Sequence, residues 1–158
     1  MSFISGAYTA TYDTSALGIT AVDSIKINHQ VFKQLITGDN FAETPQDAVF
    51  RGMAVFLDFT LNEYNATGAR KAFWPYGTAW GTMSSVIGTT DQATNAKQLI
   101  LTAVAGTPAA AAPATITFPK AILAENYPVD ILMGPRLREI PVRMRIYPNS
   151  SGEFFTLT

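Results

Sequence analysis

The side chains that do chemistry in enzymes are sparse in this chain. Its only histidine, His29, falls in the apolar register of an expected strand, where an imidazole is usually a satisfied core or interface residue. No cysteine and no second histidine are present to complete a zinc site. There is no Gly-x-Ser-x-Gly motif, and a serine nucleophile would need His29 as its base. We therefore expect a protein that is not an enzyme and uses no cofactor or metal.

The acidic residues define no catalytic or metal site either. Asp39, Glu43 and Asp47 have helical spacing, but Pro45 interrupts it. The group is more simply explained as a solvated loop than as a cation site. Neither a Gly-x-Gly-x-x-Gly motif nor a P-loop occurs, which argues against a nucleotide-dependent enzyme.

One aromatic group leaves two interpretations open. It consists of Phe73, Trp74, Tyr76 and Trp80. Such a cluster at a helix end more often packs the helix onto a sheet, and the alternative is an exposed platform for carbohydrate.

The elements that position these residues begin with the stretch 46–77, whose hydrophobic period changes in the middle. Over 53–61 every second residue is large and apolar, which is the pattern of a strand. A short helix is expected next, with Asn65 or Thr67 as its N-cap and Pro75 as its end. A long strand followed by one helix predicts a sheet covered by a single helix.

Other apolar alternations predict the remaining strands. With 53–61 they give seven or eight strands, over 7–12, 24–35, 99–104, 115–118, 127–133 and 137–147. Two connections are long, the segment 36–48 and the alanine- and proline-rich run 105–114. Loops as long as 36–48 are usually functional. The fold class predicted is all-β with one short helix and long loops.

Composition indicates one domain with few surface charges. A chain of 158 residues can bury a core without disulfides, and we expect a single domain over 1–158. Charged residues are 15% of the chain, below the usual quarter, which favours self-association. The net charge of -1 gives no overall attraction to nucleic acid or anionic lipid. No segment has transmembrane length and no signal peptide is evident, so a soluble protein without a membrane partner is expected.

Three segments give the chain a resemblance to a known family. They are GAYTATYDTSALGI, KINHQVFKQLITGDNFAETPQDAVFRGMAVFLDFTL and ILMGPRLREIPVRMRIYP. Together they resemble the tail tube and related virion proteins of tailed bacteriophages, from about Gly6 to Pro148. The resemblance implies a β-sandwich or partly closed barrel with one flanking helix. It also implies rings of six copies that stack into a tube, a conduit through which DNA is ejected.

Partners and location follow from the same resemblance. The partners implied are further copies of the chain, other phage tail proteins and duplex DNA that passes without sequence recognition. The location implied is the virion, in a tail assembled in the host bacterial cytoplasm. Another virion protein of this fold, such as a tail terminator, connector or baseplate protein, is an alternative. A capsid decoration or binding module with its aromatic group facing a ligand is another.

The resemblance also suggests contact residues. A long hairpin from each copy contributes to an inner β-barrel, and the segment 36–48 matches the loop that reaches a neighbouring subunit or ring. Phe41, apolar on an otherwise polar loop, suits a partner pocket. The expected inter-subunit and inter-ring contacts are Thr37, Gly38, Asp39, Asn40, Phe41, Glu43, Arg136, Arg138, Arg143 and Arg145.

The two arginines of the last strand have two possible directions. Arg143 and Arg145 lie on one face, and the opposite face is apolar and must pack inward. They therefore face either the lumen or a neighbouring subunit. Arginines in a bore would grip DNA phosphates, so we expect them to pair with Asp39, Glu43 or Asp47 of a neighbour. The bore would then be neutral or acidic.

Overall fold

The computed structural model describes residues 7–76, 88–104, 114–130 and 139–158. Most of the described chain forms one antiparallel sheet, which confirms the all-β prediction. Its strands are β1 (Tyr8–Tyr12), β2 (Ser15–Thr20), β3 (Lys26–Thr37), β4 (Pro45–Tyr64), β5 (Lys97–Ala103), β6 (Thr115–Leu123), β7 (Ile140–Tyr147) and β8 (Thr156–Leu157). The helical segments are α1 (Ala66–Phe73), a 3₁₀ turn (Asp39–Phe41) and a π-helical turn (Asp91–Asn95).

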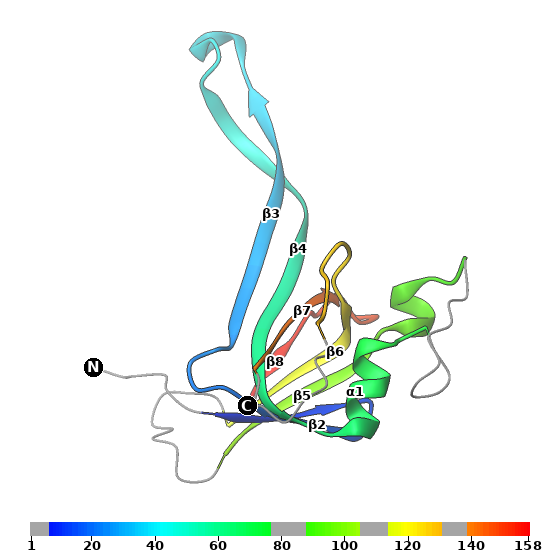
Figure 1. Cartoon of the computed structure of the whole chain (residues 1–158). Coiled ribbons are helices and arrows are strands. Elements are labelled where there is room, and N and C mark those ends of the chain that lie inside the picture. The colour runs from blue at the N-terminus through cyan, green and yellow to red at the C-terminus, as the bar shows by residue number, and fades with distance from the viewer. Residues whose placement is uncertain (1–6, 77–87, 105–113, 131–138) are drawn as a thin grey trace.

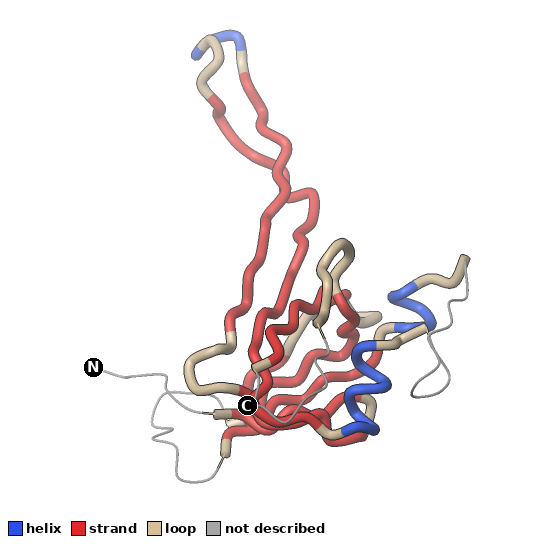
Figure 2. The backbone as a smooth tube through the Cα atoms, in the orientation of Figure 1, coloured by secondary structure: helices blue, strands red, loops and turns tan. Residues whose placement is uncertain are grey.

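Six strands pair in a closed circuit (Figures 1 and 2). The order is β2-β1-β5-β6-β7-β4, and the circuit closes because the end of β4 pairs with β2. In that pairing Gly18 lies opposite Tyr64 and Thr20 lies opposite Leu61. β8 adds to the start of β6, with Ile116 opposite Leu157. The described part of the body is therefore a barrel made from one sheet, and within it no second sheet packs on the first as a sandwich requires.

Alternate side chains of the barrel strands fill the interior. The buried set on β4 is Val55, Leu57, Phe59 and Leu61, and the set on β7 is Ile140, Val142, Met144 and Ile146. Period-2 alternation places each set on one face of its strand, and closure of the barrel buries that face. The inward faces predicted for both strands are confirmed.

Helix α1 begins where predicted and packs on β2. The Asn65 side chain accepts a hydrogen bond from the Thr67 backbone N–H at 3.0 Å, so Asn65 is the N-cap. Phe73 and Ala69 are buried on the face that meets the barrel. Gly68 is also buried, and a Cβ there would collide with the Ala16 backbone carbonyl, so the close approach of α1 to β2 needs glycine. Within the described ranges, no helix is long and apolar enough to cross a bilayer.

Two predicted boundaries were wrong. β4 spans Pro45–Tyr64 and β3 ends at Thr37, so the connection between them is 38–44, and both ends of the predicted loop 36–48 belong to strands. Register shifts at Phe32/Lys33 and at Ile36/Thr37 put the apolar residues out of phase, which hid the strand period.

Two other predicted elements are tested only in part. Residues 127–130 form no strand, and the rest of the predicted strand 127–133 lies outside the described residues. Most of the run 105–114 also lies outside them. The strands on either side of this run, β5 and β6, pair antiparallel, as expected for a hairpin.

Candidate assembly interface

A long two-stranded hairpin projects from the barrel (Figures 1 and 2). β3 pairs with β4 from Lys26 opposite Asp58 to Thr37 opposite Pro45. β7 pairs with β4 only from Val55 onward. Residues 30–54 therefore contain two strands that have no other described strand beside them, and we call this segment the distal hairpin. At about 3.3 Å per strand residue, it extends roughly 25 Å beyond the barrel.

Both long edges of the distal hairpin are open. Each strand of the barrel circuit has a paired neighbour on either side. In the distal hairpin, β3 and β4 pair only with each other among the described residues. An unpaired strand edge presents a row of backbone N–H and C=O groups that can bind another strand. The distal hairpin is thus the part of the sheet best placed to pair with a further chain.

The distal hairpin also exposes large apolar side chains on both faces. Half of the exposed large hydrophobic side chains in the described chain lie here: Val31, Phe32, Leu35, Ile36, Val49 and Phe50. Because neighbours along a strand point to opposite faces, the adjacent pairs Val31–Phe32 and Leu35–Ile36 put apolar groups on each side. Leu35 is 59% exposed and Phe50 is 57% exposed. Apolar surface on both sides of an isolated hairpin is typical of a segment that another chain covers.

The hairpin tip is acidic. Three acids, Asp39, Glu43 and Asp47, are exposed there, and the segment 34–50 contains no lysine or arginine. Within the described chain none of the three has an ion pair. The Asp47 carboxylate accepts a hydrogen bond from the backbone N–H of the next residue, at 2.7 Å. The tip therefore carries three carboxylates and no compensating cation.

The structure brings six of the predicted contact residues together at this tip. Thr37 ends β3, Gly38 precedes the 3₁₀ turn, and Glu43 follows that turn shortly before β4 begins. The turn itself holds Asp39, Asn40 and Phe41. Their clustering was implied by sequence proximity, but their position at the end of a projecting hairpin was not.

The predicted arginines lie at the base of the hairpin. Arg143 pairs with Asp58, with 3.7 Å between guanidinium and carboxylate. Asp58 also accepts a hydrogen bond from the Asn28 amide at 2.6 Å. This set ties β3, β4 and β7 together where the hairpin leaves the barrel.

Arg145 makes a tighter set beside it. Its Nε donates to both carboxylate oxygens of Glu125, at 3.0 and 2.9 Å, and its Nη2 also contacts Glu125. The hydrogen bonds from Arg145 lower the pKa of Glu125 to about 2. Phe56 contacts both arginines, with the Arg143 and Arg145 Cζ atoms 4.4 and 4.7 Å from its ring centroid. We call Asn28, Phe56, Asp58, Glu125, Arg143 and Arg145 the base cluster.

Within one chain, the acids of the hairpin tip lie far from the arginines of β7. Asp47 and Asp58 are eleven residues apart on β4, which corresponds to roughly 35 Å of strand. Pairing of Arg143 or Arg145 with tip acids of a neighbour stays a prediction, and both arginines already have acidic partners in their own chain. Arg136 and Arg138 lie outside the described residues.

His29 was expected to be a core residue or an interface residue, and the structure tests only the first of these. It lies opposite Val55, yet it is exposed, so it is not a core residue of the subunit. β3 is the edge strand there, and no other element of the described chain covers the imidazole. An interface role for His29 stays a prediction. Among the described residues no three His, Cys, Asp or Glu side chains gather in a way that could hold a metal ion.

The aromatic group divides between packing and surface. Phe73, the last residue of α1, is buried on the side that faces the barrel, as the packing interpretation expected, and cannot join an outward platform. Tyr76 is exposed, and its hydroxyl donates to the Asp91 carboxylate at 2.6 Å. Desolvation and this hydrogen bond raise the pKa of Tyr76 to about 12. Trp80 lies outside the described residues.

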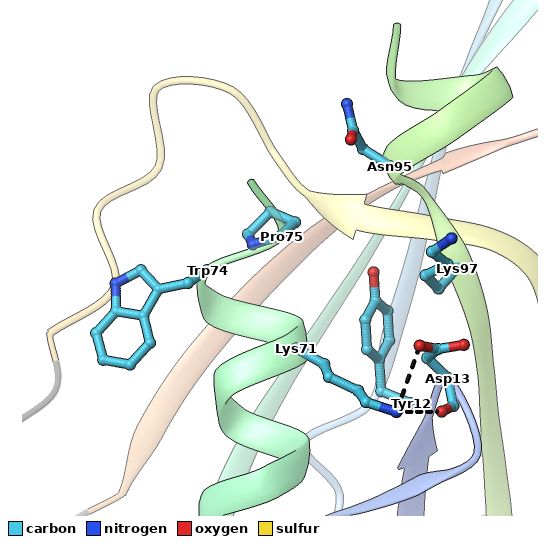
Figure 3. A pocket seen from close by; sticks show the side chains of 7 residues that line it. All are labelled: Tyr12, Asp13, Lys71, Trp74, Pro75, Asn95 and Lys97. Carbon is cyan, nitrogen blue, oxygen red and sulfur yellow. Dashed lines mark hydrogen bonds and ion pairs between the residues drawn. The ribbon is translucent and has the colours of Figure 1, made fainter. Parts of the chain in front are cut away.

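A small hollow lies beside the end of α1 (Figure 3). Its volume is about 160 Å³, and its lining is Tyr12, Asp13, Lys71, Trp74, Pro75, Asn95 and Lys97. The Lys71 ammonium donates to the Asp13 backbone carbonyl at 2.9 Å and lies 3.4 Å from the Asp13 carboxylate. The Tyr12 hydroxyl donates to the Ala121 carbonyl at 2.8 Å, and burial raises the pKa of Tyr12. We call this hollow the α1 groove.

Sequence reasoning missed the apolar surface of the distal hairpin, although a signal was present. Val31–Phe32, Leu35–Ile36 and Val49–Phe50 are adjacent apolar pairs, and such pairs cannot all point to one face of a strand. They therefore predict two apolar faces. Comparison with protein-family models finds no matching family, and comparison with curated proteins finds no significant relative.

Proposed function

We propose that this protein is the structural subunit of a phage tail tube, in which hexameric rings stack into a conduit for DNA ejection. The observation that carries the proposal is the distal hairpin, which has two open edges and apolar side chains on both faces. The resemblance of the sequence to tail tube proteins supplies the family and the ring size. An enzymatic role receives no support from the described residues.

Edge pairing explains why a hairpin of this kind would form a ring. The open edge of β3 in one copy and the open edge of β4 in the next are different surfaces, so their contact is heterologous. Such contacts form a closed ring when the rotation between copies completes a circle. The hairpins would then make an inner barrel without free strand edges. The hairpin side chains that are exposed in one subunit would be covered by other copies or would line the bore.

The charges of the hairpin suit passage of DNA. Residues 30–54 contain Lys33 and Arg51 against the three acids of the tip, a formal charge of +2 - 3 = -1. Arg143 and Arg145 are held in the base cluster by acids of their own chain. An inner barrel built from such hairpins offers few cations to phosphates, so DNA can slide.

A matched pair of surface substitutions tests the proposal. Leu35 on the hairpin and Val22 on the body are aliphatic and similarly exposed, at 59% and 61%. Leu35→Asp should leave a folded monomer, whereas Val22→Asp should assemble like the parent. Light scattering after size exclusion and negative-stain micrographs report rings and tubes.

Deletion of residues 39–44, or Phe41→Ala, provides a second test. Both changes should preserve the folded subunit and impair stacking. A parent protein that stays monomeric at high concentration and at every salt concentration would overturn the proposal, as would assembly of Leu35→Asp at the parent level. Hexameric rings that never stack would instead favour a terminator or connector of the same fold.

A further inference from the structure

We infer that the α1 groove receives the acidic hairpin tip of a second copy of this chain, so that subunits join tip to groove along the tube. This inference rests on the proposed function, because it names the surface with which one ring would meet the next. It also revises the partner of the tip acids from the arginines of β7 to the lysines beside α1.

Charge is the first argument. Arg143 and Arg145 are each paired with an acid of their own chain, whereas the tip carries three acids and no cation. The α1 groove carries Lys71 and Lys97 against the single acid Asp13. Lys71 is paired with Asp13 and sits in the last turn of α1, where it also offsets the helix dipole. Lys97 is exposed and has no ion pair among the described residues, so it is the main cation available to a carboxylate.

The size and lining of the groove are the second argument. At about 160 Å³ it is smaller than the 300 to 1,000 Å³ typical of small-molecule sites, and it has room for only one or two side chains. Pro75 provides apolar lining at the end of α1, while the Trp74 indole points away from the lysines (Figure 3). The tip sequence places an aromatic residue, Phe41, between two acids at positions 39 and 43. The acids of the tip and the lysines of the groove give the two surfaces opposite charge, which favours their association in a defined orientation.

The positions of tip and groove are the third argument. The tip lies at the far end of the projecting hairpin, whereas α1 lies on the side of the barrel (Figure 1). Tip and groove are different surfaces that lie far apart in one subunit, so a contact between them is heterologous and can join successive copies. Such a contact leaves the hairpin edges free to pair within a ring.

Cysteine cross-linking tests the contact directly, because the natural chain contains no cysteine. A chain with Glu43→Cys and Lys97→Cys should give a ladder of disulfide-linked multimers on a non-reducing gel after assembly and oxidation. The matched control is Glu43→Cys with Lys26→Cys, which moves the second thiol to another exposed lysine away from the groove. The control should remain mostly single chains.

Charge reversal tests the energetic role. Lys97→Glu should lose stacking but still form single rings, and Asp39→Lys or Glu43→Lys in the same chain should restore tubes. If the parent forms tubes while Lys97→Glu stacks equally well and the cysteine pair does not cross-link, the tip-to-groove contact is overturned and the proposed function stands. A parent that forms neither rings nor tubes overturns the proposed function and this inference with it.

Discussion

The two halves of β4 form one continuous strand but differ in burial. From Val55 to Leu61 alternate side chains are buried in the barrel, whereas from Pro45 to Phe50 no side chain is buried. Both halves are rich in apolar residues and both pair with β3 along part of their length. The difference lies in the neighbours. Residues 55–61 have β7 beside them and the barrel interior beneath them, whereas residues 45–50 pair with β3 alone among the described strands. Apolar strand residues thus serve the subunit core in one half and remain available to another chain in the other.

The largest expected effect comes from removing an aromatic ring from each half. Phe59 is 2% exposed, and Phe59→Ala should lower the free energy of unfolding by about 3 to 5 kcal/mol through lost burial and a cavity. Phe50 is 57% exposed, and Phe50→Ala should change it by no more than about 0.5 kcal/mol. Denaturant unfolding of dilute, unassembled subunits measures both. Equal losses of unfolding free energy in the two variants would mean that the distal hairpin is packed within the subunit. The two halves of β4 would then not differ in the way described.

A glycine in the body should show how tightly α1 is seated. Ala in place of an exposed helix glycine usually stabilises by about 1 kcal/mol. Gly68→Ala should instead destabilise by about 1 to 3 kcal/mol, because its Cβ would meet the Ala16 carbonyl and push α1 off β2. Thr67→Ala, one residue earlier and exposed, is the control and should shift the thermal midpoint little. A gain in stability for Gly68→Ala would show that the helix can move freely on the barrel.

The base cluster joins the two regions and should matter more for hairpin direction than for stability. Asp58→Ala removes the partner of both Arg143 and Asn28, and because these groups are partly exposed the loss should be about 1 kcal/mol or less. Tube formation should fall, since the hairpin base loses its tie to β7. Glu63→Ala, an exposed acid on the same strand, serves as the control in both denaturation and microscopy. Unimpaired tubes from Asp58→Ala would show that pairing of β3, β4 and β7 alone directs the hairpin.

The smallest expected effect is a pH dependence of the same cluster. Hydrogen bonds from Arg145 hold the pKa of Glu125 at about 2, below the ordinary value near 4.3. A depressed carboxyl pKa stabilises the folded state above the ordinary value, and that contribution is lost as pH falls through about 2. NMR titration of Glu125 should show the low midpoint, and Arg145→Gln should return it toward the ordinary range. A midpoint near 4 in the parent protein would mean that the pair does not persist in solution.

Local pattern in the sequence determined the parts of this fold that depend on near neighbours. The inward faces of β4 and β7 follow from period-2 alternation, and the Asn65 cap follows from residue types at the change of period. Each of these features has one buried side or one short-range hydrogen bond, so the residues themselves carry the signal. The sequence likewise shows that the acids of the tip lie close together.

Only the tertiary structure decided where β4 leaves the barrel and what the arginines meet. Residues 45–52 have no buried face, so no alternation marks them as strand, and the register shifts opposite Phe32 and Ile36 broke what period remained. The partners of Arg143 and Arg145 were set by the antiparallel register of β4, β7 and β6, which brings Asp58 and Glu125 within reach. Strand register joins residues far apart in sequence through backbone hydrogen bonds and shared burial, and no local pattern specifies it.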